Sequence, residues 1–325
     1  MAKILGIVSL IALLIVVVLT VSFAWNQDAK IMKSLVVNNK LEKYGVTIIP
    51  STNSDFDTEL TTYLKDSKES VASYTDAVKP FAVYVKNTSN KDIVGVSLRW
   101  EITKLDGSIQ VSPQTEMSPN QLMGIKPRNP LLRGGLISSN SSRFFALDKN
   151  IQSLVRNESD TKTWNRSSVL TDEKIKQLQN YVPELRAKKQ KIAEESSSIS
   201  VVIDGIFFGD GTFVGTDRDY LFATMKAHIK AQKDFVKEVR EAVKAKKSPK
   251  EIFKWFEFLA AERPLAPDRL NSNEAENYEY SYKVEFYYSA ETSLRKKQKW
   301  TESEIIEKIM ATEFDDSILL RKGGL

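Results

Sequence analysis

Apolar and polar side chains alternate strictly along residues 96–103. Val96, Leu98, Trp100 and Ile102 are apolar, and the residues between and after them are Ser97, Arg99, Glu101 and Thr103. Alternation with a period of two places all the apolar side chains on one face of a β-strand. Asp106 and Gly107 follow, and both residue types tolerate the positive φ of a tight hairpin turn. The pattern therefore predicts a half-buried strand that ends in a hairpin, with Trp100 in the core.

Other short apolar segments predict further strands. They are residues 46–49, which end at Pro50, and residues 81–86, 142–147 and 199–208. The last of these is nearly continuous in apolar residues, which is typical of a strand buried on both faces. Near the C-terminus, apolar residues at even positions from Tyr278 to Tyr288 alternate with mostly polar residues and predict one more half-buried strand.

Helical patterns lie between and after these strands. They cover residues 54–72, 171–195 and 216–247, a segment from Ser248 to before Pro264, and a segment from Thr301 to about Thr312. Ser248 is followed by Pro249 and Glu251, which is the sequence of an N-cap, a first-turn proline and a capping glutamate. Thr301 and Glu304 have the spacing of a second capping box.

The first two dozen residues determine the expected compartment. The run Ile4–Ala24 contains no charged residue and is long enough to span roughly 30 Å as a helix, the thickness of the hydrocarbon core. Trp25 follows where an interfacial aromatic side chain would lie. Ser22 and Ala24 also fit a signal-peptidase site, although signal peptides have shorter apolar runs of about 7–15 residues. The sequence favours a retained anchor with the bulk of the chain outside the cytoplasm, periplasmic or at the cell surface, and a cleaved signal is the alternative.

Composition narrows the possible chemistry. The 325 residues are 42% hydrophobic and 27% charged, which is typical of a globular protein. The chain has no cysteine, which excludes disulfides, thiolate nucleophiles, zinc–cysteine sites and iron–sulfur clusters. A cysteine-free exported domain is more typical of a bacterial than of an animal protein. His228 is the only histidine, and no partner for a catalytic triad or a multi-histidine metal site can be named beside it.

The predicted strands of residues 78–148, with Trp100 on the core face of a central strand, resemble those of an immunoglobulin-like β-sandwich. Such domains occur in uncharacterised exported bacterial proteins, but the disulfide cysteines of antibody domains are absent here. The resemblance implies an α+β fold, namely an antiparallel immunoglobulin-like β-sandwich with long helical insertions, preceded by one N-terminal transmembrane helix. The predicted organisation is an anchor or signal segment at 1–25, a polar stem at 26–75 and the extracytoplasmic sandwich domain at 76–325.

Four aspartates surround the glycine-rich loop at residues 209–216. They are Asp204, Asp210, Asp217 and Asp219. Calcium binds such oxygen ligands, so Asp210, Asp217 and Asp219 are candidate metal ligands, although their spacing differs from that of an EF-hand. Turn and cap chemistry explains the same residues more simply, because Asp210-Gly211 suits a hairpin turn and acidic residues favour the start of a helix. We therefore expect neither a metal nor a cofactor.

A stripe of basic residues follows the predicted helix at 216–247. Its members are Lys226, Lys230, Lys233, Lys237, Arg240, Lys244 and Lys247. They fall within an arc of roughly 100° on a helix. Between residues 226 and 254 the net charge is +6, more than the +5 of the whole chain. Such a stripe suits anionic lipid headgroups, an acidic protein or a polyanionic polymer of the envelope, and a merely solvated helix face is the alternative. No aromatic-interleaved basic motif supports nucleic acid as a partner.

These features favour a membrane-anchored, extracytoplasmic interaction or structural module of the cell envelope that is not an enzyme. Two alternatives remain. An exported hydrolase that uses carboxylates would need neither cysteine nor histidine. A soluble periplasmic binding protein would result if the N-terminal segment were cleaved.

Overall fold

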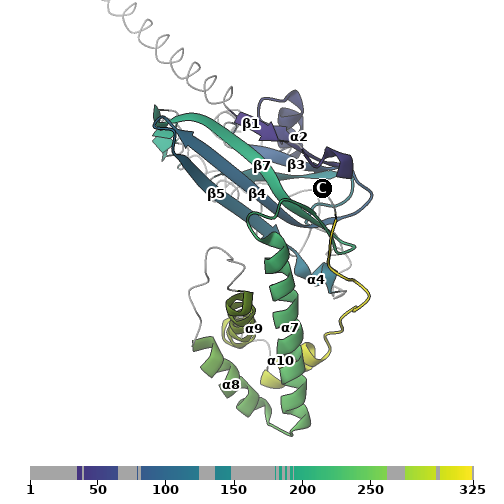
Figure 1. Ribbon diagram of the computed structural model, residues 1–325. Helices are drawn as coiled ribbons and strands as arrows, with labels where there is room; N and C mark the ends of the chain where they lie inside the picture. The colour runs from purple at the N-terminus through teal and green to yellow at the C-terminus, as the bar shows by residue number, and fades with distance from the viewer. Residues whose placement is uncertain are drawn as a thin grey trace, which may run out of the picture. The chain divides into compact units, whose positions relative to one another are not determined.

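The computed structural model in Figure 1 describes most of the chain after residue 34. The described residues are 35–38, 40–64, 79, 82–123, 136–147, 194–261, 275–297 and 301–323, together with 180, 183–184, 187–188 and 191–192. The predicted anchor at residues 4–24 and most of the predicted helix at 171–195 lie outside this part of the chain. Within the described ranges, no helix has the length and apolar character needed to cross a membrane.

The fold is α+β, with two mostly antiparallel sheets and several helices. The larger sheet has six strands. Its order is β5 (Ile109–Met117), β4 (Ile93–Lys104), β7 (Ser196–Phe208), β8 (Thr212–Gly215) and β9 (Arg321–Lys322), and β1 (Leu35–Asn38) also pairs with β7. The smaller sheet contains β2 (Val46–Pro50), β3 (Ala82–Asn87) and β6 (Ser141–Ala146) in that order. Strand β1 runs parallel to β7, and β9 runs parallel to β8.

Strand β4 confirms the alternating pattern from Leu98 onwards, whereas residues 93–98 are buried at every position, including Ser97 on the predicted polar face. The side chains of Leu98 and Trp100 are fully buried, at 0% exposure. Arg99 and Glu101 lie on the other face, where Arg99 Nε donates to Glu101 Oε1 at 2.9 Å. The predicted hairpin is also present, because Gly107 has a φ of +83° and the Lys104 N–H donates to the Ser108 carbonyl at 2.8 Å.

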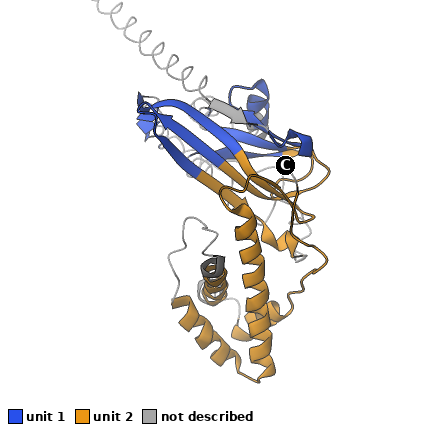
Figure 2. Ribbon diagram, viewed as in Figure 1, with its two compact units in different colours: residues 1–86, 99–112, 142–202 blue, residues 87–98, 113–141, 203–325 orange. Residues whose placement is uncertain are grey.

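The chain divides into two compact units, which Figure 2 distinguishes by colour. The first unit contains residues 1–86, 99–112 and 142–202. Tyr84 of β3 lies at the centre of an aromatic cluster within it. Its ring meets Phe56 of α2 (Ser54–Leu64) at 5.1 Å and Phe144 of β6 at 5.5 Å, both edge to face. This geometry is favourable for aromatic pairs and stabilises the packing of α2 against the smaller sheet. A 3₁₀ helix, η1 (Glu42–Tyr44), precedes β2.

The second unit contains residues 87–98, 113–141 and 203–325. Strands and helices of this unit form one apolar cluster. Val94, Phe207 and Phe213 belong to strands, Leu122 ends the short helix α4 (Pro119–Leu122), and Leu221 and Met225 lie in the first two turns of the helix that begins at Leu221. The Phe213 ring crosses the backbone of Gly205 so closely that a Cβ at that position would lie 2.6 Å from it. Glycine at 205 therefore allows the β7–β8 pair to close over its own aromatic core.

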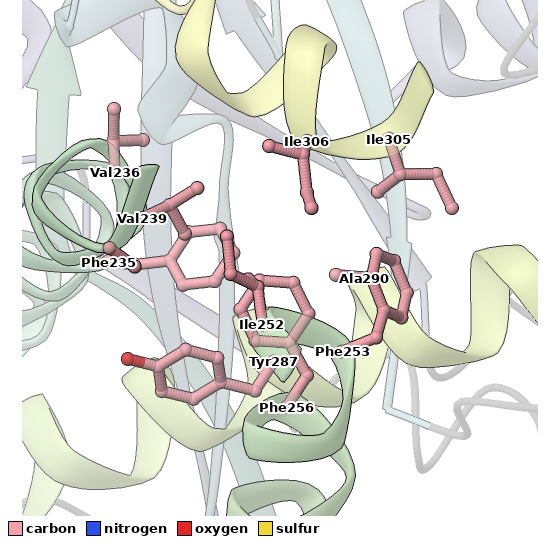
Figure 3. Packing of buried hydrophobic residues seen from close by; sticks show 11 residues of the cluster. Phe235, Val236, Val239, Ile252, Phe253, Phe256, Tyr287, Ala290, Ile305 and Ile306 are labelled. Atoms are coloured by element: carbon pink, nitrogen blue, oxygen red, sulfur yellow. The ribbon is translucent and has the colours of Figure 1, made fainter. Parts of the chain in front are cut away.

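Four helices of the second unit pack around another apolar cluster, shown in Figure 3. The helices are α7 (Leu221–Lys244), α8 (Pro249–Ala261), α9 (Ala275–Lys297) and α10 (Glu302–Met310). At the centre, the Phe235 ring lies 4.9 Å from that of Tyr287 and 5.8 Å from that of Phe256. Both predicted capping boxes are confirmed: Thr301 and Glu304 cap α10, and Ser248 exchanges hydrogen bonds with Glu251 at the start of α8.

The strand predicted from Tyr278 to Tyr288 is wrong, because this segment lies within helix α9. Its buried residues are Val284, Tyr287, Ala290 and Glu291, which recur every three or four positions, whereas Tyr280 is 45% exposed. Within 278–288, aromatic residues lie at exposed as well as buried positions of the helix, and this hides the helical period. The alternation of aromatic residues along the sequence is therefore incidental to the packing.

Helix α7 is shorter than predicted at both ends. It begins at Leu221 because Asp217 and Tyr220 adopt positive φ values of 61° and 57°. It ends at Lys244 because Lys246 has a φ of 58°. Residues 35–64, predicted as part of a polar stem, hold β1, β2 and α2.

Candidate functional site

The basic stripe of α7 does not form one continuous free surface. Lys230 forms an ion pair with Glu279 of α9, and Lys233 forms one with Asp316 beyond α10. Arg240 donates from Nη2 to the carbonyls of Met310 at 2.9 Å and Thr312 at 2.5 Å. These three residues therefore connect α7 with neighbouring segments of the second unit, a role that the sequence did not indicate.

The other four stripe residues are exposed. Lys226, Lys244 and Lys247 have no salt-bridge partner among the described residues, and Lys237 lies 3.9 Å from Glu241 one turn along α7. An exposed pair at this spacing is worth only about 0.3–0.5 kcal/mol. Three of these four lysines, Lys237, Lys244 and Lys247, lie in the C-terminal part of α7 or just after it.

Three further lysines extend this end into α8. We call Lys244, Lys246, Lys247, Lys250 and Lys254 the lysine cluster; all five are exposed, and none has a salt-bridge partner within the part of the chain that the structure describes. Sequence reasoning missed Lys246, Lys250 and Lys254 because they lie in the turn and in the next helix. The excess of lysine between residues 226 and 254 was the signal for them.

One acidic residue, Glu251, lies between the lysines of the cluster, and its carboxylate caps α8. Glu251 Oε2 accepts hydrogen bonds from the hydroxyl and the N–H of Ser248, both at 2.7 Å. These bonds, first of all the one from the hydroxyl, lower the pKa of Glu251, and Lys247 and Lys254 act in the same direction. The Glu251 carboxylate thus caps α8, and the five lysines of the cluster lie on both sides of it along the chain.

Two of the three candidate metal ligands, Asp210 and Asp217, pair with basic residues. Asp210 binds Lys91 at 2.7 Å and Arg321 at 3.4 Å. Partial burial acts to raise its pKa, but hydrogen bonds from Lys91 and Thr212 outweigh burial and lower the pKa to about 2. No group of three or more potential ligands that could hold a metal ion occurs among the described residues.

The remaining aspartates position the start of α7. Asp217 pairs with Lys322 at 2.9 Å and accepts the N–H of Phe222 at 3.0 Å, which caps the helix. Asp219 donates its N–H to the fully buried carboxylate of Asp204 at 2.8 Å. These contacts fit the turn and cap interpretation of the aspartates.

His228 of α7 lies between two aromatic rings of α9. Its ring centroid is 4.8 Å from that of Tyr282 and 5.1 Å from that of Phe286. Its Nδ1 is buried without a hydrogen-bond partner in the described part of the chain. Burial lowers the pKa of His228 to about 4, so the imidazole is neutral at pH 7 and packs as an apolar group.

The pKa of His228 predicts an acid-sensitive contribution to stability. Burial favours the neutral imidazole, so this contribution is complete above pH 6.5 and is lost as the pH falls from 6.5 towards 4. The loss should be about 2.5 kcal/mol at pH 4.5. Urea unfolding at pH 7 and pH 4.5 measures it. In His228→Phe the stability difference between these two pH values should be smaller than in the parent by this amount, and an unchanged difference contradicts the prediction.

An open groove lies between α7, α9 and α10. Its lining is Gln232, Phe235, Val236, Phe286, Ser289, Ala290, Ile305, Lys308, Ile309 and Thr312. None of these described residues is an aspartate or a glutamate. A hydrolase that acts through two carboxylates needs both of them at one cleft, and this groove does not supply them.

Comparison with protein-family models, with curated proteins and with solved structures finds no match to this chain.

Proposed function

We propose that this chain is a non-catalytic interaction module of the cell envelope, anchored in a membrane by residues 4–24, with residues 26–325 outside the cytoplasm. The lysine cluster supports this proposal most strongly. Between residues 244 and 254 the chain carries a net charge of +4. The five lysines are exposed, and the one carboxylate among them caps a helix. Such a surface attracts an anionic partner over a distance of several ångströms.

The apolar run at residues 4–24 supports the anchor. It is interrupted only by Ser9, Thr20 and Ser22 among polar residues, and it matches the thickness of a bilayer core. Large domains that follow such a segment are translocated largely regardless of their charge, which favours the placement of residues 26–325 outside the cytoplasm.

A retained anchor has a direct experimental consequence. The chain purified from native membranes should begin at or near Met1 and should stay in the membrane fraction after a carbonate wash, because carbonate releases peripheral proteins but leaves spanning helices in place. Amino-terminal sequencing and immunoblotting of the washed membranes measure this. A mature chain that begins at Trp25 contradicts the anchor and favours the soluble binding protein.

We also propose that the two sheets pack against each other as an immunoglobulin-like sandwich. Within the first unit, both sheets contribute fully buried side chains: Trp100, Ile199 and Val201 come from the larger sheet, and Tyr84 and Phe144 come from the smaller one. Apolar faces of two sheets that are both buried are typical of a sandwich core.

The interaction proposal predicts salt-sensitive binding to polyanions. The full-length chain in nanodiscs of neutral lipid should be retained on immobilised polyglutamate at 0.1 M salt and released at 1 M salt. The Debye length falls from about 10 Å to about 3 Å over this range. Lys244→Gln/Lys247→Gln should elute at lower salt than the parent.

Lys230→Gln/Lys233→Gln is the matched control for charge. It removes two positive charges from residues that already have acidic partners, so its elution should change less than that of Lys244→Gln/Lys247→Gln. If the parent is not retained, or if both double variants elute alike, the lysine cluster is only a solvated surface and the proposed function fails.

A further inference from the structure

The lysine cluster lies where α7 turns into α8, a turn visible at the lower end of both helices in Figure 1. Lys244 ends α7, Lys246 and Lys247 form the turn, and Lys250 and Lys254 belong to the first two turns of α8. The cluster thus gathers charge from two helices at one exposed end of the helical packing.

The backbone at Lys246 is one that glycine adopts more easily. Its φ is 58°, in the left-handed region. The turn closes through hydrogen bonds from the Lys246 N–H to Val243 O at 2.9 Å and from the Lys247 N–H to Ala242 O at 3.1 Å. This arrangement ends many helices, usually with glycine at the left-handed position. Lysine there introduces strain that glycine would relieve, and it adds a positive charge to the turn.

The lysines of α8 are also unfavourable for local stability. Lys250 is the second residue of α8, at the end of the helix where the helix dipole disfavours cations. Lys250 and Lys254 are four residues apart, a spacing at which like charges repel. Lys254 is in addition attracted to Glu251 three residues earlier, so the clearest cost to local stability lies at Lys246 and Lys250.

An apolar side chain continues the same face of α8. Phe258 follows Lys254 by four residues and is 65% exposed, although the other side of this helix buries Ile252, Phe253 and Phe256. Lysine side chains around an exposed aromatic ring are typical of helices that lie at a bilayer interface. The aliphatic parts of the lysines cover apolar surface while their ammonium groups stay in the headgroup layer.

We propose that the lysine cluster and Phe258 dock the α7–α8 turn on an anionic lipid bilayer. The ammonium groups bind lipid phosphates and carboxylates, and the Phe258 ring enters the boundary between headgroups and acyl chains. This inference rests on the proposed function and specifies the anionic partner. A fluid bilayer can accept the exposed Phe258 ring at any point of its surface. An acidic protein would have to offer a pocket for this ring at the right distance from its acidic residues.

Binding to supported bilayers tests the inference. The full-length chain in nanodiscs of phosphatidylcholine should bind a bilayer that contains phosphatidylserine and should not bind one of phosphatidylcholine alone, as measured by surface plasmon resonance. Each lysine near an anionic surface changes binding by about fivefold, so Lys250→Gln/Lys254→Gln should weaken it by about 25-fold. Lys226→Gln/Lys237→Gln removes the same charge from exposed positions outside the cluster and should weaken binding by much less.

Two single variants distinguish the contribution of the Phe258 ring from that of the lysine charge. Phe258→Ser should weaken binding and leave its salt dependence unchanged, because it removes no charge. Lys246→Gly should weaken binding but raise the urea midpoint of unfolding by about 0.3 M, because glycine relieves the left-handed strain. A loss of binding with a higher midpoint cannot be attributed to unfolding.

Equal binding of the parent to both bilayers, or equal effects of the two double lysine variants, overturns the inference. If the chain binds polyglutamate in a salt-sensitive way but does not bind phosphatidylserine, the lipid assignment fails and an acidic protein becomes the partner. If it binds neither surface, the proposed function fails as well.

Discussion

Replacing Trp100 with alanine should lower the free energy of unfolding by about 3–5 kcal/mol, the usual range for emptying a buried aromatic site. Trp100 is 0% exposed and lies on the core face of β4, in the larger sheet. The substitution removes the largest fully buried side chain among the described residues and leaves a cavity that the surrounding strands cannot fill without moving. Urea unfolding followed by circular dichroism measures the change.

Arg99→Ala is the matched control on the same strand. Arg99 faces away from the core, where its side chain is 20% exposed and pairs with Glu101. Loss of such a pair should cost no more than about 1 kcal/mol. If Trp100→Ala and Arg99→Ala destabilise the protein equally, the assignment of the core face is wrong.

Replacing Asp204 with alanine should destabilise the protein by about 1.5–3 kcal/mol, the range for loss of hydrogen bonds to a charged group. The carboxylate of Asp204 is completely buried and accepts three hydrogen bonds. Its donors are the Thr216 hydroxyl at 2.5 Å, Arg218 Nε at 3.2 Å and the Asp219 N–H at 2.8 Å. Alanine removes the acceptor of all three donors. Thr216 and Arg218 are exposed, so water can replace the acceptor there, whereas the half-buried Asp219 N–H loses a bond to a charged group.

Two variants calibrate the role of Asp204. Asp204→Asn keeps an acceptor oxygen and should cost less than Asp204→Ala. Thr216→Val removes only one donor and should cost about 1 kcal/mol. Thermal unfolding of all three variants gives the order of stability. If Asp204→Ala is as stable as Thr216→Val, the carboxylate does not organise the segment that precedes α7.

The sequence predicted the local features whose pattern is set by near neighbours. The alternation in β4 and the Asp106-Gly107 turn follow from a period of two and from positive φ, and neither depends on the rest of the fold. The capping boxes at Ser248 and Thr301 were predictable for the same reason, because their hydrogen bonds join residues three positions apart.

Features set by distant residues could not be predicted in this way. Helix α9 appeared as a strand because aromatic residues occupy both exposed positions, such as Tyr280, and buried ones, such as Tyr287, so hydrophobicity did not report burial. Lys233 appeared free because its partner Asp316 is 83 residues away in sequence. The lysine cluster is different, because it is local in sequence. It was missed because the stripe was followed only to the end of the predicted helix at residue 247, and Lys250 and Lys254 belong to the next helix.

Amine labelling of isolated native membranes tests the central claim most directly. If the lysine cluster meets an anionic partner in the envelope, a brief pulse of an acetylating reagent should modify Lys244, Lys250 and Lys254 several-fold less than Lys226 and Lys237, as quantified by mass spectrometry. After a wash at 1 M salt or transfer into neutral nanodiscs, the two groups should react alike, because screening releases the partner. Equal modification of both groups in the native membranes, with no change after the wash, would contradict the account.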